Sequence, residues 1–164
     1  MKKTLFALFL LMSAGCGFHL RATHSAAPAL TAITIAADET VDPVVLDALR
    51  QQFLRRGIAL NSDVWRLKID EHYRQRIEAA IGGQRDHQVS EVDIVDGYRA
   101  QLWSGGKLLA EMPIAHRASV VYSSAEYSGS SAEEEKAHQN LAKMNAESVL
   151  RFIDASMKQQ QLPQ

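Results

Sequence analysis

Basic side chains recur at every second position over one part of the chain, a pattern that suits phosphate binding. Polar and apolar residues alternate over 64–77, as in a β-strand with one buried face. The even positions place four cations within about 33 Å of extended chain: Arg66, Lys68, Arg74 and Arg76. Arginine forks onto phosphate oxygens and lysine adds a point charge. We predict that these cations share one strand face, with Tyr73 and Ile77 in the core on the other.

A second interpretation of these cations needs no ligand. The next alternating run, 89–104, carries Glu91 and Asp93 on its polar side. Opposite charges that face each other across neighbouring strands contribute about 0.2 to 1 kcal/mol per pair. The cations can therefore form either a solvated charge network or a phosphate site, and the two roles can coexist. The last alternating run, 107–123, adds Arg117 as a fifth candidate cation.

The first residues have the layout of an export signal that ends at a lipidated cysteine. Two lysines precede the nine apolar residues 4–12, a run too short to span a bilayer. Small residues at 13–15 lead to Cys16, and LMSAGC resembles a bacterial lipobox. Cys16 is the only cysteine, so it cannot form an internal disulfide. We expect acylation of Cys16, and Gly17 after it favours the outer membrane by analogy with other lipoproteins.

Composition and motifs argue against several classes of function. The 164 residues are 46% hydrophobic with a net charge of -1, which indicates one globular domain and no nucleic-acid binding. No nucleophile elbow, phosphate loop, dinucleotide fingerprint or two-histidine metal motif is present. We therefore expect no enzyme, metal or cofactor. Six histidines are expected on the surface or in the tether: His19, His24, His72, His87, His116 and His138.

The order of alternating and helical segments predicts an α+β domain at residues 30–158. We expect two helices packed on one face of a four-stranded, mostly antiparallel sheet, in the order β-α-β-β-β-α. The expected strands are 30–36, 64–77, 89–104 and 107–123, and the expected helices are 43–56 and 131–157. The other expected segments are a signal peptide at 1–15, a lipidated N-terminus and tether at 16–29, and a polar tail at 159–164.

Turn and cap residues support these boundaries. Asp42 and Pro43 suit a helix start, and Gly57 suits its end. Glycine pairs at 82–83 and 105–106 mark two turns, and 131–134 (SAEE) reads as a capping box. Pro113 cannot donate to a strand ladder, so its strand is expected at the edge of the sheet or bulged.

The residues after the cysteine carry a family resemblance. Positions 16–21 read C-G-F-H-L-R, which resembles the mature N-terminus, C-G-[FW]-x-L-R, of the LptE (RlpB) family of lipopolysaccharide-assembly lipoproteins. The order of predicted elements agrees with that family along nearly the whole mature chain. The resemblance implies the α+β architecture above and an outer-membrane location. It also implies partnership with the β-barrel LptD, in which the lipoprotein acts as a plug and helps to place lipopolysaccharide in the outer leaflet.

The resemblance also bears on the candidate cations. With lipopolysaccharide as the implied ligand, we predict from the spacing of the cations that they bind its phosphorylated lipid A region: Arg66, Lys68, Arg74, Arg76 and Arg117. One departure is that Ser119 stands where the family commonly has arginine, with Arg117 two residues earlier and Tyr122 keeping the aromatic that follows. The alternative function is a periplasm-facing lipoprotein that binds a lipid or peptide without a barrel partner, and a lipoprotein hydrolase ranks third.

Overall fold

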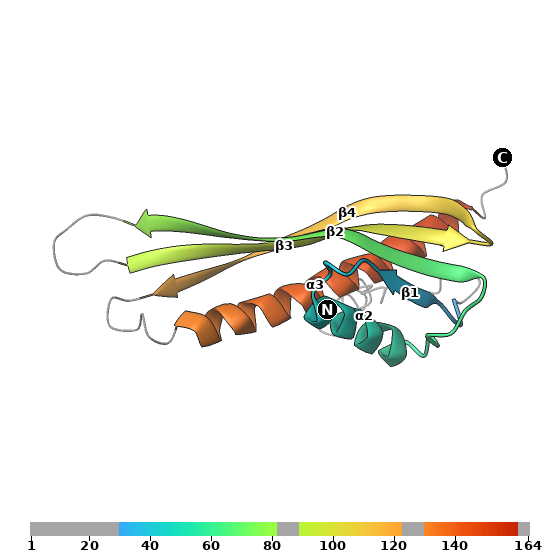
Figure 1. Cartoon of the computed structure of the whole chain (residues 1–164), viewed down its shortest axis with the longest axis horizontal. Helices are drawn as coiled ribbons and strands as arrows, with labels where there is room; N and C mark the ends of the chain where they lie inside the picture. The colour runs from blue at the N-terminus through green and yellow to red at the C-terminus, as the bar shows by residue number, and fades with distance from the viewer. Residues whose placement is uncertain (1–29, 82–88, 123–129, 161–164) are drawn as a thin grey trace, which may run out of the picture.

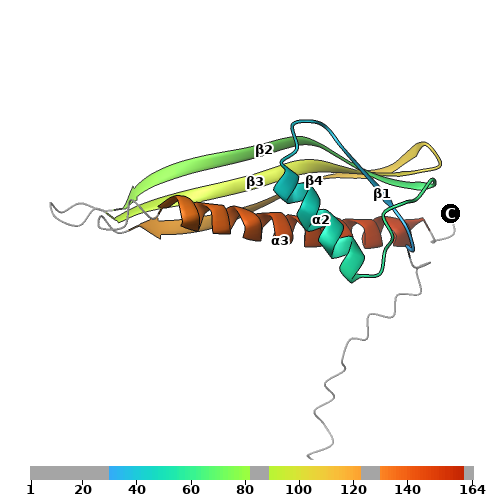
Figure 2. The ribbon, with the colours of Figure 1, turned by 60° about the horizontal axis from the view of Figure 1, so that its bottom comes forward.

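Two helices cover one face of a four-stranded sheet and leave its other face without a helix (Figures 1 and 2). The computed structural model describes residues 30–81, 89–122 and 130–160. Its elements are β1 (Thr34–Ala37), α2 (Pro43–Arg55), β2 (Trp65–Ile81), β3 (Val89–Ser104), β4 (Lys107–Tyr122) and α3 (Ser130–Gln159). This is the predicted β-α-β-β-β-α order. We call the covered side of the sheet the helix face and the other side the open face.

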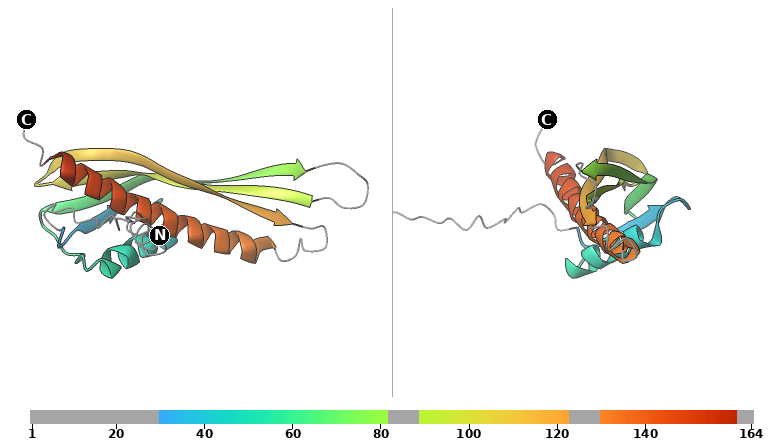
Figure 3. Two further views of the ribbon diagram at one scale, coloured as in Figure 1. Left: turned by 180° about the vertical axis from the view of Figure 1, so that it is seen from behind. Right: turned by 90° about the vertical axis from the view of Figure 1, so that its left-hand side faces the viewer.

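The sheet is a meander with one parallel strand added at its side. The strand order is β1-β2-β3-β4, with β1 parallel to β2 and the other two pairs antiparallel. Gly105 and Gly106 close the β3–β4 hairpin with φ of +55° and +81°, as their glycine pair predicts. β4 is the edge strand that Pro113 requires. β1 reaches only as far as Ile69 of β2, so the longer strands β2, β3 and β4 extend well beyond it (Figures 1 and 3).

Helix α2 begins and ends where its sequence signals place it. Asp42 is the N-cap and accepts a hydrogen bond from Val44 N at 2.9 Å, and Pro43 occupies the first turn. Gly57 follows the helix with φ +73°, a left-handed conformation that suits glycine. The helix lies across the middle part of α3, which itself runs beneath most of the sheet (Figures 1 and 2).

The main core lies between the helix face and the two helices. Leu67 and Ile69 of β2 and Tyr98 and Leu102 of β3 are fully buried there, against the apolar faces of α2 and α3. The helices contribute residues at helical spacing: Val45, Leu49 and Phe53 from α2, and Ala146, Val149 and Ile153 from α3. Each large apolar side chain buried in this way contributes about 1.5 to 3 kcal/mol.

A bulge in β2 reverses the alternation halfway along the strand. Asp70 pairs with Arg99 of β3, but the next pair is Tyr73 with Gly97, so two residues on β2 are set against one on β3. Glu71 occupies the bulge with φ +52°. An extra residue exchanges the two faces for every side chain beyond it. The predicted single basic face of β2 is therefore wrong.

The same reversal corrects the predicted core positions of β2. Tyr73 and Ile77 were expected to be buried, but they are 43% and 44% exposed. Both lie beyond the bulge, where odd-numbered positions turn to the open face. Gly97, which pairs with Tyr73, leaves room for that ring, because a Cβ on Gly97 would lie 2.7 Å from the tyrosine ring. The bulge thus places an aromatic and an aliphatic side chain on the open face.

Several predicted boundaries shift by a few residues. The strand expected at 30–36 is shorter and later, with only a bridge between Ala32 and Ala59 before it. The last helix extends to Gln159 rather than 157, so the expected polar tail overlaps its end. The predicted cap residue Ser131 lies inside the helix, and its side chain is outside the described residues. The signal peptide, the tether with Cys16 and the turn at 82–83 also lie outside them.

Candidate functional site

The bulge divides the five candidate cations between two sides of the sheet. Arg66 and Lys68 precede it and lie on the open face, where Arg66 pairs with Trp103 across the ladder. Arg117 of β4 pairs with Val95 and also lies on the open face. Arg74 and Arg76 follow the bulge and lie on the helix face. The structure does not bring the five together into one site.

Arg74 and Arg76 connect β2 to the helices. The guanidinium of Arg74 donates to Asp42 Oδ2 at 2.7 Å, at the N-cap of α2. Arg76 donates from Nε and Nη2 to the carboxylate of Glu134 on α3, at 3.1 to 3.2 Å, and also contacts Glu78. Their charges are therefore matched by carboxylates of the same domain.

The partners predicted for these arginines were the wrong ones. Glu91 and Asp93 pair across the ladder with Ala79 and Ile77, so they are not opposite Arg74 and Arg76. Asp93 instead lies 3.4 Å from Arg117 Nη1 and accepts a hydrogen bond from Ser119. A structural charge network does exist, as one interpretation proposed, but around Arg74 and Arg76 it runs from β2 to the helices.

A buried polar group lies at the centre of the helix face. Asp96 of β3 is fully buried, and Asn145 of α3 donates to its backbone oxygen at 3.0 Å and to its Oδ1 at 3.1 Å. His72 Nε2 lies 3.4 Å from Asp96 Oδ2, and Arg74 Nε lies 3.7 Å from it. His138 Nδ1 is 3.2 Å from the same oxygen, close enough for a charge interaction but outside hydrogen-bond geometry. We call these five residues the Asp96 cluster.

Charges in the Asp96 cluster stabilise one another. Burial by itself raises the pKa of Asp96, but contacts with His138 and His72 outweigh it and hold that pKa far below its ordinary value. The hydrogen bond to Asp96 raises the pKa of His72 above 6.5, against the opposing effect of burial. The carboxylate is therefore ionised, and His72 retains its proton more readily than a free histidine.

The histidines on the sheet and on α3 correct another expectation. His72 and His138 are buried and His116 is half-buried, whereas all were expected on the surface or in the tether. The sequence does not show this, because the polar partners of these histidines, Asp96 and Asn145, lie far from them along the chain. His19, His24 and His87 lie outside the described residues.

His116 takes part in an arrangement that resembles a nucleophile triad. Its Nδ1 lies 2.7 Å from Asn145 Oδ1, and its Nε2 lies 3.4 Å from Ser148 Oγ. The Ser148 hydroxyl, however, donates to the backbone oxygen of Met144 at 3.1 Å, and it accepts a hydrogen bond from Arg151 at 2.8 Å. Backbone N–H groups within a helix are already bonded and cannot form an oxyanion hole. We interpret this arrangement as a structural link between β4 and α3.

Lys68 on the open face belongs to a network around Asp70. Lys68 Nζ donates to Asp70 Oδ2 at 3.0 Å, and Arg99 Nε donates to Oδ1 at 2.9 Å. Arg99 also lies 2.7 Å from Glu71 at the bulge. The hydrogen bond from Arg99 lowers the pKa of Asp70, against the effect of burial. Arg99 was not among the candidate residues, although the alternation of 89–104 already placed it on a polar strand face.

A hollow of about 550 Å³ lies on the open face next to β1. Its volume falls within the range of about 300 to 1,000 Å³ that is usual for small-molecule sites. The residues that line it are Thr34, Ala36, Ser62, Asp63, Val64, Arg66, Lys68, Trp103 and Gly106. Two of the candidate cations, Arg66 and Lys68, therefore meet a tryptophan and several oxygen-bearing groups in one concave place.

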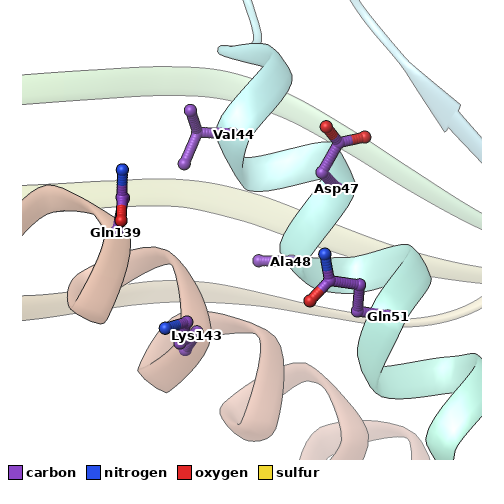
Figure 4. A pocket seen from close by; sticks show the side chains of 6 residues that line it. All are labelled: Val44, Asp47, Ala48, Gln51, Gln139 and Lys143. Carbon is purple, nitrogen blue, oxygen red and sulfur yellow. The ribbon is translucent and has the colours of Figure 1, made fainter.

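A second depression lies between the two helices and is much smaller. Figure 4 shows Val44, Asp47, Ala48 and Gln51 on α2 opposite Gln139 and Lys143 on α3. Its volume is about 200 Å³, below the usual range for ligand sites. The open-face hollow is thus the stronger candidate for ligand binding.

Two further features of the described residues bear on function. Their His, Cys, Asp and Glu side chains include no group arranged to hold a metal ion. Neither α2 nor α3, the helices of this part of the chain, has the length and apolar composition of a membrane span.

Solved structures with the same fold are bacterial lipoproteins. The rare lipoprotein B of Shewanella oneidensis matches with a TM-score of 0.66 and 11% identity, over 80% of this chain and 99% of that one. The minor lipoprotein of Acinetobacter baumannii matches with a TM-score of 0.59 and 15% identity, over 77% and 92%. Lipoprotein B of Nitrosomonas europaea matches with a TM-score of 0.54 and 17% identity, over 77% and 83%.

At these identities the likeness concerns the fold. No protein-family model and no curated protein matches the sequence. Each of the three structures is covered over most of its own length, so the common architecture is that of the whole domain. The chain therefore has the α+β fold of the rare lipoprotein B structures.

Proposed function

We propose that this chain is a lipid-anchored outer-membrane lipoprotein of the LptE (RlpB) family. In this role it pairs with the barrel LptD and helps to place lipopolysaccharide in the outer leaflet. The observation that carries the proposal is the agreement of two independent features. One is the fold of rare lipoprotein B over more than three quarters of the chain. The other is the C-G-F-H-L-R sequence beginning at the lipobox cysteine, Cys16.

The surface of the domain suits a place inside a barrel. A barrel lumen is lined by polar residues, and a plug needs polar or mixed surfaces to lie against it. The open face provides such a surface: Arg66, Lys68, Arg99 and Arg117 alternate there with Tyr73, Ile77 and Trp103. A lipid on Cys16 would hold this domain at the membrane, because two or three acyl chains make an effectively permanent anchor.

Binding of lipopolysaccharide is the second part of the proposal. Arg66, Lys68 and Arg117 lie on the open face, where a phosphorylated lipid headgroup has access to them. Lys68 and Arg117 each also contact a carboxylate, Asp70 and Asp93 respectively. Arg74 and Arg76 are weaker candidates than the sequence indicated, because Asp42, Asp96 and Glu134 already match their charges. A binding and assembly role, rather than catalysis, fits this arrangement.

Affinity purification from detergent-extracted outer membranes tests the proposed partnership. We expect the full chain to co-elute with one large β-barrel protein in a fixed ratio, and mass spectrometry of the lipoprotein to find an acylated Cys16 as its first residue. A Cys16→Ser variant should lose the acyl mass and is the matched control for anchoring. Recovery of the lipoprotein without any barrel would favour the partner-free alternative, and a free thiol on Cys16 would overturn the anchor.

A further inference from the structure

The open-face hollow combines charged, aromatic and hydroxyl groups around one space. Its walls come from β1, from the 62–64 segment and from the ends of β2 and β3. These segments are fixed to one another by Thr34 Oγ1, which donates to Ser62 O at 2.7 Å, and by parallel pairing of β1 with β2. The hollow is therefore built on paired strands, which hold side chains more firmly than a free loop does.

Arg66 is the cation of the hollow that no carboxylate of the described residues neutralises. Within residues 30–81, 89–122 and 130–160 it has no ion pair, and it is exposed. Lys68 beside it interacts with Asp70 at 3.0 Å and Asp38 at 3.8 Å. An unpaired guanidinium next to a partly neutralised ammonium offers a forked donor to one anionic group.

The rest of the lining suits an uncharged ring that carries hydroxyl groups. Trp103 lies partly buried, and its indole N–H donates to Gln101 Oε1 at 3.3 Å, which orients the ring. The Ser62 Oγ accepts from the backbone N–H of Val64 and of Trp65, so its own proton is still available. Asp63 accepts hydrogen bonds but repels a bare anion. A ligand with both hydroxyl groups and a phosphate satisfies these walls better than phosphate alone.

We propose that the hollow binds a phosphorylated sugar, with the phosphate on Arg66, the ring against Trp103 and ring hydroxyls on Asp63 and Ser62. An indole presents an apolar face to the C–H side of a pyranose, and polar groups at the rim take its hydroxyls. This rests on the proposed function, since the hollow would seat the phosphorylated sugar unit of the glycolipid. Arg117 lies about 30 Å along β4 from the hollow and takes no part in it.

The test follows the indole N–H signals of the full chain by nitrogen–proton correlation NMR in detergent. The chain has two tryptophans, and a Trp103→Phe variant assigns the signal of Trp103. N-acetylglucosamine 1-phosphate, whose ring is uncharged, should shift this signal saturably, at a dissociation constant at least tenfold lower than that of N-acetylglucosamine or of inorganic phosphate. Arg66→Ala should weaken the binding at least tenfold, Arg66→Lys should weaken it less, and Arg50→Ala, at an exposed arginine of α2, should leave it unchanged.

Lipid A micelles distinguish the two sources of such a ligand. A shift at lower concentration than with N-acetylglucosamine 1-phosphate assigns the hollow to the glycolipid, and the reverse order assigns it to a soluble sugar phosphate. No saturable shift with the sugar phosphate, or an equal affinity for inorganic phosphate, would overturn the proposal. Because the isolated chain is titrated, a failure to recover a barrel in affinity purification would leave this result unaffected.

Discussion

At the scale of the residue, Asp96 is the charged group at the centre of the buried polar contacts of the helix face. It is fully buried, and both β2 and α3 direct polar side chains at it. Removal of one member of a buried charge group costs more than the group contributes net, because the others are left without a partner. The Asp96 cluster therefore specifies how the sheet and α3 fit together.

We predict that Asp96→Asn lowers the free energy of unfolding by about 3 kcal/mol, since His72, Arg74 and His138 lose their shared anion. Asp93→Asn is the matched control on the same strand. Asp93 faces the other side of the sheet and pairs with the exposed Arg117, so its loss should cost under about 1 kcal/mol. Urea unfolding of both variants measures the difference, and equal midpoints would show that the buried cluster contributes little.

The pKa shifts of this cluster predict a stability maximum in mildly acidic solution. The pKa of His72 is raised, so its contribution is complete below about pH 6.5 and is lost as pH rises through the folded value. The pKa values of Asp96 and Asp42 are lowered, so their contributions are complete above about pH 4 and are lost as pH falls further. Stability should therefore peak between about pH 4.5 and 6.5.

Urea midpoints measured from pH 3 to 9 test this profile. His72→Gln should flatten the alkaline side while leaving the acid side in place, because Asp96 still titrates in that variant. A midpoint that rises from pH 6 to pH 8 in the natural chain would contradict the predicted sign.

At the scale of the element, the helices and the bounds of α2 could be predicted from the sequence, whereas the basic face of β2 could not. The bulge in β2 is the reason for this failure. Caps, glycines and helical spacing are local signals, and they placed α2 within one residue. The even positions of 66–76 are polar on both sides of Glu71, so the basic residues keep the same spacing through the bulge. Arg74 and Arg76 are polar but lie on the helix face, and Tyr73 and Ile77 are apolar but lie on the open face. The one local sign of the reversal is Glu71 itself, a charged residue in the otherwise apolar odd-numbered series from 65 to 73.

We predict opposite outcomes for two changes at the bulge. Deletion of Glu71 should restore regular pairing and turn Arg74 and Arg76 away from Asp42, Asp96 and Glu134, at a cost of more than about 3 kcal/mol. Glu71→Gly should change stability by less than about 1 kcal/mol, because glycine adopts the left-handed backbone without strain while an exposed ion pair with Arg99 is lost. Circular dichroism and urea unfolding report both, and a deletion variant as stable as the natural chain would contradict the assigned register.

At the scale of the whole molecule, the sheet separates structural charge from accessible charge. Sequence order alone predicted the layers, because β-α-β-β-β-α with an edge proline leaves few alternatives. It could not predict which cations meet a carboxylate from a distant helix, since Arg76 and Glu134 are 58 residues apart in sequence. The helix face uses its charges to join the layers, whereas Arg66 and the hollow lie on the open face, away from these contacts.

This division predicts that charge reversal has different effects on the two faces. The Arg74→Glu, Arg76→Glu double variant should lose about 3 kcal/mol of stability or more, because three carboxylates would then face new acidic groups. The Arg66→Glu, Arg117→Glu double variant should stay within about 1 kcal/mol of the natural chain. It should nevertheless bind lipopolysaccharide several-fold more weakly at low salt, with a smaller difference at high salt because exposed charges are screened. Titration with lipopolysaccharide beside urea unfolding measures both effects. If the helix-face variant loses affinity without losing stability, while the open-face variant binds normally, the assignment of ligand binding to the open face is wrong.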